Sequence, residues 1–391
     1  MKLNEASRVK EIKFSAIRVI AQLVDDLAKA GKKVIDLSIG RPDFDTPAHI
    51  KEAGKKALDA GKVHYTSNYG IPELRKALSH KLSRDNGVMY QPEEIIITVG
   101  AVEALAIGFM TFIEPGDEVI IPEPSWVNYA SIVRLAGGTP VFVSLAVQDG
   151  FSLIPSRVID KISSRSKAII FASPNNPTGT MLSRDVLTQL SKIAMDHNLV
   201  VIGDEVYEKI TYDGAEHISM ASLPGMKERT ITCNAFSKTY SMTGWRLGYL
   251  AADESLMPSL IKVHQNLVTS ANSIAQWAAL EAVTGSQQCV EEMVEEFGRR
   301  RNFLIEAFKD LAPLRLIRPE GAFYGFVDVR SLGMTSVQAV EFFIKEAGVA
   351  MVPGDSFGPS GEGYVRLSFA VSMDNLKEAM EKVRIAVKKR V

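Results

Sequence analysis

The sequence predicts an α/β protein with a sheet that helices bury on both faces. Six short apolar runs alternate with stretches of helical spacing through the middle of the chain. Strands covered on both faces have this unbroken apolar character because neither face meets water. The predicted strands are Glu94–Val99, Glu118–Ile121, Lys167–Phe171, Leu199–Gly203, Thr230–Cys233 and Leu247–Leu250.

Helical spacing marks the elements outside the sheet. Residues 16–30 place apolar side chains at intervals of three and four, and Gly31 ends the run. An apolar helix is expected over 104–112, and a long one over about 256–284. A polar segment at 285–288 then separates the sheet region from another helical stretch and an α/β remainder.

Length and composition narrow the class of protein. The 391 residues suffice for two domains with a sizeable core. The chain has 45 basic and 46 acidic residues, so we expect no nucleic-acid partner. It has neither an apolar signal core nor a run near the ~20 apolar residues that span a bilayer, so we expect a cytoplasmic protein without membrane contact. With two cysteines the chain cannot form a disulfide framework. The sequence has no Cys/His cluster of the kind that binds a metal, so we expect no metal site.

One tract, residues 234–246, carries the strongest functional signal. It places Lys238 directly after Ser237 and eight residues before Arg246, in a segment otherwise short of charge. A lysine amine in a partly desolvated pocket can form a Schiff base with an aldehyde. A hydroxyl and a guanidinium are what a phosphate monoester needs. An aldehyde that carries a phosphate is pyridoxal 5'-phosphate (PLP), so the tract predicts a PLP site. Lys238 would then also move protons at the substrate α-carbon.

Other candidate groups follow the predicted strands, where ligands of open α/β sheets gather. Asp204 ends the strand 199–203, and a carboxylate there can hold the pyridine nitrogen of PLP protonated. A helix cap is the alternative for this residue. Gly100, Ala101 and Val102 open a helix whose first N–H groups can cradle the phosphate, although an ordinary strand-to-helix turn has the same pattern.

Seven motifs in a fixed order make the chain resemble the class I and II aminotransferases of PLP fold type I. The resemblance runs from about Ile17 to the C-terminus. It implies a mainly parallel seven-stranded sheet in a large domain and a smaller α/β domain built from both chain ends. The implied bounds are an arm at 1–13, a small domain at 14–48 and 290–391, and a large domain at 49–289. The motifs are Gly40–Pro47, Tyr65 before Gly70–Arg75, Pro174–Gly179, Asp204–Tyr207, the lysine tract, Gly321–Tyr324 and Arg366.

The resemblance also implies roles at the cofactor. Tyr207 would donate to its phenolic oxygen, and Trp126 would stack on its ring. The phosphate would be held by Ser237, Arg246, the helix start and Tyr65. Family members take that tyrosine from the neighbouring subunit, so we expect a homodimer. The chain departs from the family at Val102 and Ala235, where relatives often carry polar side chains that bind the phosphate.

The implied substrate site has three parts. Asn176 would bond both the phenolic oxygen and the substrate carboxylate, and Gly40 would supply a backbone N–H to that carboxylate. Arg366 would pair with it through two parallel hydrogen bonds. A solvated arginine on an open sheet face is the alternative for Arg366. Cis peptide bonds are expected at Glu123–Pro124 and Asn176–Pro177, because relatives hold cis prolines there.

The identity of the substrate stays open. His264, Gln265 and Asn266 occupy the stretch in which one branch of aspartate aminotransferases has an arginine. Arg41 is the remaining cation that can read a second carboxylate, unless it pairs structurally with Asp43 or Asp45. The alternative is a pocket for aromatic or aliphatic side chains, and its expected lining is Phe14, Ile17, Ile39, Val102 and Tyr324.

The resulting prediction is a PLP-dependent aminotransferase with a ping-pong mechanism. An amino acid leaves as its 2-oxo acid, and a second 2-oxo acid, which we expect to be 2-oxoglutarate, accepts the amino group. A fold-type I lyase, such as a C–S β-lyase, is the alternative because both reactions pass through the same carbanion. An effector domain of a transcription regulator is rejected, because only about 15 residues precede the first helix. Neither a G-x-G-x-x-G after an early strand nor a P-loop occurs.

Overall fold

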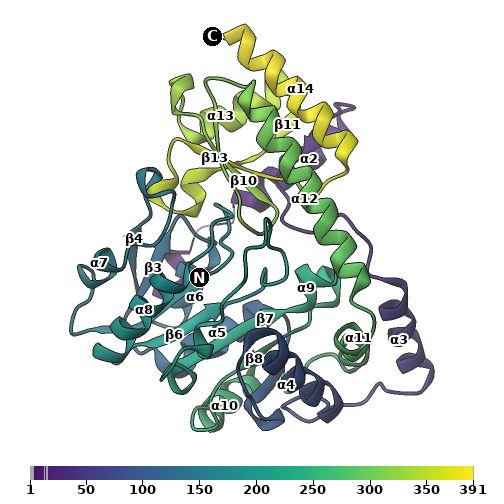
Figure 1. Ribbon diagram of the computed structural model, residues 1–391, viewed down its shortest axis with the longest axis vertical. Coiled ribbons are helices and arrows are strands. Elements are labelled where there is room, and N and C mark those ends of the chain that lie inside the picture. The colour runs from purple at the N-terminus through teal and green to yellow at the C-terminus, as the bar shows by residue number, and fades with distance from the viewer. Residues whose placement is uncertain (1–3, 13, 15, 391) are drawn as a thin grey trace.

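The protein, seen as a computed structural model that describes residues 4–12, 14 and 16–390, is built around a seven-stranded sheet (Figure 1). Its strand order is β2-β8-β7-β6-β5-β3-β4. Among these strands β8 alone runs antiparallel to its neighbours, so the sheet is mainly parallel, as predicted. The strands are β2 (Ile95–Thr98), β3 (Glu118–Glu123), β4 (Thr139–Ser144), β5 (Ser166–Ala172), β6 (Val200–Asp204), β7 (Thr230–Ala235) and β8 (Gly248–Ala251).

Helices cover both faces of this sheet. One face packs against α5 (Ala101–Phe112), α6 (Asn128–Leu135) and α10 (Met257–Leu267). The other packs against α4 (Pro72–Asn86), α11 (Ser273–Thr284) and α8 (Arg184–Asp196). The apolar residues of the strands thus meet helices on both sides, which explains their unbroken runs. In the part of the chain that the structure describes, no helix has the length and apolar character that crossing a bilayer requires.

The predicted long helix over 256–284 is wrong. The structure divides it into α10 and α11, with residues 268–272 between them. Thr269 has a left-handed backbone (φ 66°) that ends the first helix. The Asn272 side chain accepts a hydrogen bond from the N–H of Ala275 and caps the second. A strand at 139–144 was also not predicted. This strand, β4, lies at the sheet edge and is only partly buried, so its residues carry a weaker apolar signal.

A second group of elements joins both ends of the chain. Strands β12 (Val352–Pro353), β13 (Tyr364–Ser368), β10 (Tyr324–Asp328) and β9 (Arg315–Ile317) form an antiparallel sheet. The parallel pair β1 (Ile35–Asp36) and β11 (Val349–Ala350) links the N-terminal segment to the last third of the chain. In Figure 1 this group lies at the top, with the purple early segment among yellow and green later ones.

Helices also belong to this second group. Phe297 and Leu304 of α12 share a buried core with Val365 of β13 and Val383 of α14. These helices are α2 (Ala16–Lys29), α12 (Gln288–Lys309), α13 (Ser336–Phe342) and α14 (Met373–Arg390), and elsewhere lie α1 (Ser7–Lys10), α3 (Ala48–Asp59), α7 (Pro155–Ile159) and α9 (Phe236–Thr239).

Candidate active site

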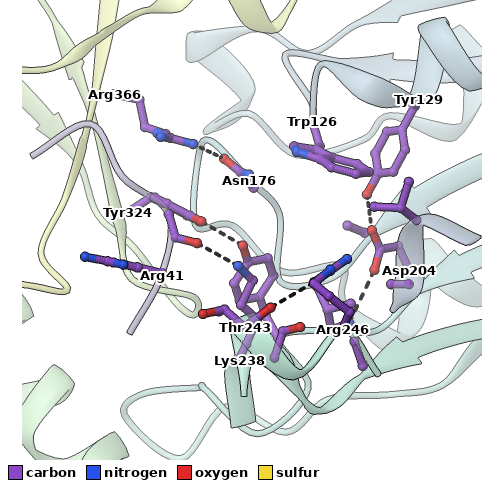
Figure 2. Close-up of a pocket in the computed structure, with 18 residues that line it drawn as sticks. Arg41, Trp126, Tyr129, Asn176, Asp204, Lys238, Thr243, Arg246, Tyr324 and Arg366 are labelled. Atoms are coloured by element: carbon purple, nitrogen blue, oxygen red, sulfur yellow. Dashed lines mark hydrogen bonds between the residues drawn. The ribbon is translucent and has the colours of Figure 1, made fainter. Parts of the chain in front are cut away.

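A cavity of about 350 Å³ opens between the two groups of elements, at the carboxyl ends of strands β5, β6 and β7 (Figure 2). This position is where ligands of open α/β sheets bind, and the volume suits a small molecule. All the predicted site residues but Gly100 and Tyr65 line it. They are Gly40, Ala101, Val102, Trp126, Asn176, Asp204, Tyr207, Ser237, Lys238, Arg246 and Arg366.

Lys238 projects into this cavity from α9, the short helix that directly follows β7. Its Nζ donates a hydrogen bond to the carbonyl oxygen of Gly40 at 2.6 Å. Burial lowers the pKa of Lys238 to about 8, the positive charge of Arg366 adds to that effect, and Asp204 opposes it. A substantial fraction of the amine is therefore neutral near physiological pH, which a nucleophilic lysine requires.

Asp204 is the last residue of β6 and lies on the opposite side of the cavity from Arg41 (Figure 2). Its Oδ2 accepts a hydrogen bond from the hydroxyl of Tyr129 at 2.6 Å. Burial raises the pKa of Asp204 to about 6, and the hydrogen bond from Tyr129 limits the rise. The helix-cap alternative does not describe this residue, because its bonds go to Tyr129 and to the N–H of Val206 in a turn.

Sequence reasoning missed Tyr129. This residue lies on α6, is buried, and packs edge-on against Trp126 with ring centroids 5.4 Å apart. The spacing of three residues between these aromatics was the available signal, since it places both on one side of a helical turn.

Arg366 on β13 is 1% exposed, so the alternative of a solvated arginine is wrong. Its guanidinium donates to Oδ1 of Asn176 at 3.0 Å and to the carbonyl oxygen of Ser38. The group lies over the ring of Tyr324, with Cζ 4.5 Å from the ring centroid. Its Nε has no hydrogen-bond partner among the described residues. Burial lowers the pKa of Arg366. A carboxylate in the cavity would balance the charge of this guanidinium.

The other end of the cavity is suited to an anion. Gly100 precedes α5, and a Cβ there would lie 2.7 Å from Nη2 of Arg246, so only glycine allows this close approach. Arg246 itself has a left-handed backbone (φ 52°), which is strained for a side chain of this size. Ser237 lies one residue before Lys238 on the cavity wall. The helix start, a hydroxyl and a guanidinium thus converge.

Tyr207 follows β6, and its hydroxyl lies 2.7 Å from the hydroxyl of Tyr324. Tyr324 fills the space beside Gly40, where a Cβ would come within 2.4 Å of the phenolic oxygen. The peptide bonds at Glu123–Pro124 and Asn176–Pro177 are both cis, as predicted, and so are those at Ser173–Pro174 and Ala312–Pro313.

Tyr65 lies outside the cavity and is 89% exposed, so this chain alone does not bring it to the predicted phosphate site. Phe14 is 97% exposed and does not line the cavity, and neither does Ile39. The side chain of Ile17 lies outside the described residues. Of the expected apolar lining, Val102 and Tyr324 reach the cavity.

Arg41 reaches the cavity wall from the loop after β1. Its expected structural partners are engaged elsewhere, because Asp43 pairs with Arg300 at 2.7 Å and Asp45 pairs with Lys51. Within the described chain Arg41 itself has no hydrogen bond or ion pair, so the alternative of a pairing with Asp43 or Asp45 is wrong. The guanidinium is therefore available to a ligand.

These features together fit PLP. A partly buried amine with a depressed pKa can take an aldehyde, and a buried carboxylate can face a protonated ring nitrogen. The helix start beside Arg246 can take the phosphate, and the guanidinium of Arg366 at the cavity wall can take a substrate carboxylate.

Comparisons with known proteins agree with this fit. Residues 32–383 match the family model described as aminotransferase class I and II. An aspartate aminotransferase of Pyrococcus abyssi is 44% identical over 92% of each chain. Aromatic-amino-acid aminotransferase 2 of Thermococcus litoralis is 43% identical over 93% of this chain and 94% of that one. A structure of Thermus thermophilus aspartate aminotransferase with maleate has a TM-score of 0.94 and 40% identity over 98% of this chain and all of that one. The chain therefore belongs to the class I and II aminotransferases and is an enzyme that moves amino groups between amino acids and 2-oxo acids with pyridoxal 5'-phosphate as its cofactor.

Proposed function

We propose that transamination at this site rests on three groups that face one cavity, the partly buried Lys238 and the buried Asp204 and Arg366. When bound, PLP supplies an aldehyde carbon and an electron-withdrawing pyridinium ring. Lys238 would bind the aldehyde carbon, and its amine would move a proton at the substrate α-carbon. Its pKa of about 8 supports this role, because proton transfer is most efficient when the pKa of the catalyst is near the working pH.

The remaining residues of the cofactor site hold PLP and orient it. Asp204 keeps the ring nitrogen protonated, and Trp126 stacks on the ring face. Tyr207 donates to the phenolic oxygen, which Asn176 also contacts. The phosphate is held by Ser237, Arg246 and the backbone N–H groups at Gly100, Ala101 and Val102.

The substrate carboxylate is held by Arg366, Asn176 and the N–H of Gly40. The bidentate geometry of a guanidinium fixes the direction of the bond from the α-carbon to its hydrogen. A fixed direction selects which bond is cleaved, and cleavage of the bond to hydrogen is the step that transamination needs. The C–S lyase alternative is not favoured, because the related proteins are aminotransferases.

For the substrates, we infer that the donor is aspartate or an aromatic or other hydrophobic amino acid and that the acceptor is 2-oxoglutarate. The names of the relatives, aspartate and aromatic-amino-acid aminotransferases, support this range. Arg41 supports it further, because 2-oxoglutarate carries a second carboxylate even when the donor is aromatic. The guanidinium of Arg41 at the cavity wall, which is unpaired among the described residues, can bind that carboxylate.

We also infer a homodimer in which Tyr65 of each chain reaches the phosphate site of the other. The 89% exposure of this tyrosine supports the idea, because its side chain is free to contact another chain. The exposed position of Arg246 leaves room at the phosphate site for a residue from outside the chain.

The domain bounds and the location of the protein complete the proposal. The arm at 1–13, the small domain at 14–48 and 290–391 and the large domain at 49–289 are supported by the pairing of β1 with β11. A cytoplasmic location is part of the same proposal.

A single-turnover experiment tests the proposed function. The PLP-loaded protein is mixed with one amino acid at a time and no 2-oxo acid, while the visible spectrum of the cofactor is followed. Transamination releases one equivalent of the matching 2-oxo acid per subunit and leaves the cofactor in its amino form. Continued release of ammonia and pyruvate from an unchanged cofactor would show a lyase instead. The amino acids that respond identify the donor class.

A further inference from the structure

Two buried tyrosine hydroxyls touch between the substrate side and the cofactor side of the cavity. The oxygens of Tyr207 and Tyr324 are 2.7 Å apart, and their rings meet edge to face with centroids 5.8 Å apart. Within the described chain neither hydroxyl has any other hydrogen-bond partner. Figure 2 shows Tyr324 above Lys238, with Arg366 beyond it.

The direction of this hydrogen bond matters because each phenol has a single proton. Both tyrosines line the cavity, but Tyr324 is 1% exposed and its oxygen is packed against Gly40, whereas Tyr207 is 5% exposed. If Tyr207 donated to Tyr324, the described residues would offer the proton of Tyr324 no acceptor. A buried donor without an acceptor is costly. If Tyr324 donates, the proton of Tyr207 is free, and Tyr207 lines the cavity.

Arg366 favours the second direction. Its guanidinium lies 4.5 Å from the centroid of the Tyr324 ring, and this positive charge stabilises negative charge on the phenol. Burial raises the pKa of Tyr324, but Arg366 opposes the rise. Burial raises the pKa of Tyr207 well above its usual value, and the neighbouring Tyr324 adds to it. The cation that lies 4.5 Å from its ring thus favours Tyr324 as the donor of the pair.

We propose that Tyr324 is a positioning residue for transamination, whose hydroxyl donates to Tyr207 and so directs the one proton of Tyr207 toward the phenolic oxygen of the cofactor. Tyr324 acts through Tyr207 and needs no contact of its own with the cofactor. The inference rests on the proposed role of Tyr207. It goes beyond that role because it adds a second hydroxyl, that of Tyr324, which donates to Tyr207. The positive charge of Arg366 helps to polarise this second hydroxyl.

Tyr324→Phe tests the proposal because it removes the oxygen and keeps the ring under Arg366. In the PLP-loaded protein, the pH midpoint of the change in visible absorbance reports how tightly a proton is held at the phenolic oxygen. Loss of the Tyr324 hydroxyl weakens the hydrogen bond from Tyr207 to the phenolic oxygen and leaves this oxygen more basic. The midpoint should therefore rise, by roughly half to one pH unit for one neutral hydrogen bond.

A double-mutant cycle separates action through Tyr207 from a direct effect. Tyr207→Phe should raise the midpoint further than Tyr324→Phe does, and adding Tyr324→Phe to it should change nothing more. Tyr212→Phe is the matched control, since its buried hydroxyl donates to the carbonyl of Ala322 in the same core but does not reach the cavity. It should leave the midpoint unchanged.

The outcomes distinguish this inference from the proposed function. An unchanged midpoint in Tyr324→Phe, or equal shifts in the presence and absence of the Tyr207 hydroxyl, would overturn the positioning role while wild-type single turnover still stands. Failure of the wild-type protein to convert its cofactor with any amino acid would overturn the proposed function itself. Far-ultraviolet circular dichroism and thermal unfolding show whether each variant is folded. Should Tyr324→Phe not fold, a Tyr324 labelled with 3-fluorotyrosine, which is more acidic, should lower the midpoint.

Discussion

The hydroxyl of Tyr129 donates to Oδ2 of Asp204 across 2.6 Å, and both side chains are buried. Burial raises the pKa of Asp204 to about 6, whereas the hydrogen bond from Tyr129, that from the N–H of Val206 and the charge of Lys238 lower it. Tyr129 is therefore the largest single influence that keeps this carboxylate ionised near neutral pH. An ionised Asp204 is what a protonated pyridine ring requires.

Tyr129→Phe should raise the pKa of Asp204 further. A hydrogen bond to a charged group contributes about 1.5–3 kcal/mol, or roughly one to two pKa units. At pH 7 most of the Asp204 population in the variant is then neutral, so PLP affinity and kcat should fall about tenfold. Both should recover toward pH 9, where the carboxyl ionises again. Equilibrium dialysis of PLP and steady-state kinetics from pH 6 to pH 9 measure the effect.

Tyr249→Phe is the control for this change, because the Tyr249 hydroxyl is buried without a hydrogen-bond partner in the described chain. Removing it should leave both pH profiles alone. If Tyr129→Phe gives the wild-type profile as well, Tyr129 does not govern the ionisation of Asp204.

Lys238→Ala should abolish turnover and leave the fold largely intact. The variant lacks the amine that binds the aldehyde and carries the proton of the α-carbon, a role that contributes roughly 10²- to 10⁴-fold by proton transfer alone. Single-turnover kinetics and circular dichroism measure the two parts of the prediction. Lys192→Ala on α8, where the lysine is exposed, is the control and should be fully active. Substantial activity without Lys238 would contradict the mechanism.

Arg366→Lys keeps the positive charge and removes the planar guanidinium group. The lysine cannot form two parallel bonds to a carboxylate, so kcat/KM for the amino acid should fall about 10- to 100-fold, which corresponds to one charge-assisted hydrogen bond. PLP affinity should stay within about twofold, since Arg366 is assigned to the substrate. Steady-state kinetics and dialysis give the two values.

The control for this variant is Arg301→Lys. Arg301 is equally buried, lies over the ring of Tyr212 at 5.3 Å and bonds Asp213, but it is outside the cavity. Its substitution should affect stability rather than kcat/KM. Loss of the cofactor from Arg366→Lys would mean that Arg366 holds PLP rather than the substrate.

Arg41→Met tests whether Arg41 binds the second carboxylate of 2-oxoglutarate. The KM for 2-oxoglutarate should rise about tenfold, the effect of one partly exposed charge pair with good geometry. The KM for an aromatic amino donor should change less than about twofold, because that substrate has one carboxylate. Arg184→Met, at an exposed position on α8, controls for the change in net charge. Equal changes for both substrates would remove Arg41 from substrate recognition.

The sheet was predictable because its strands are buried on both faces and read as unbroken apolar runs. The edge strand β4 was missed because one side of it is partly exposed. The break between α10 and α11 depends on a left-handed residue, Thr269, and on the Asn272 cap, and both lie within a stretch that otherwise has helical spacing.

The site was predictable to the extent that its residues lie in short motifs. Lys238, Asp204 and Arg366 each follow or occupy a strand with a clear pattern. Contacts between distant segments had no such signal. Tyr207 and Tyr324 are 117 residues apart, and Tyr129 and Asp204 are 75 apart, so only the folded sheet brings them together. The position of Tyr65 depends on a second chain and stays a prediction.

A charge cluster lies just behind the segment that carries Asp204 and Tyr207. Glu205 lies 3.2 Å from Nε2 of His217, and Glu208 pairs with Lys81, with all four side chains at most 7% exposed. The ligand atoms of the two glutamates and His217 lie within 4.8 Å of one another. When His217 is protonated, its charge and that of Lys81 balance the two carboxylates. The charge state of this histidine therefore affects the stability of the segment behind the cofactor site.

The pKa of His217 is raised in the folded protein. Burial alone would lower it, but the negative charge of Glu205, 3.2 Å from Nε2, outweighs burial. A raised pKa stabilises the fold fully below the unfolded value of about 6.5, and this contribution is lost as pH rises through the folded pKa. The pKa of Glu208 is lowered, because Lys81 and His217 outweigh burial. Its contribution is lost only as pH falls below the unfolded value of about 4.3, so it is constant from pH 6 to pH 9.

His217→Gln should therefore destabilise the protein more at pH 6 than at pH 9. Removal of one partner from a buried ion pair costs roughly 3–5 kcal/mol, and this difference in the free energy of unfolding should shrink as wild-type His217 loses its proton. Urea denaturation at both pH values, at fixed protein and PLP concentrations, measures it. His197→Gln, at an exposed position after α8, should show no such pH dependence. An equal loss of stability at pH 6 and pH 9 would mean that His217 is not a titrating member of the cluster, and that its role is to fill space beside Glu205.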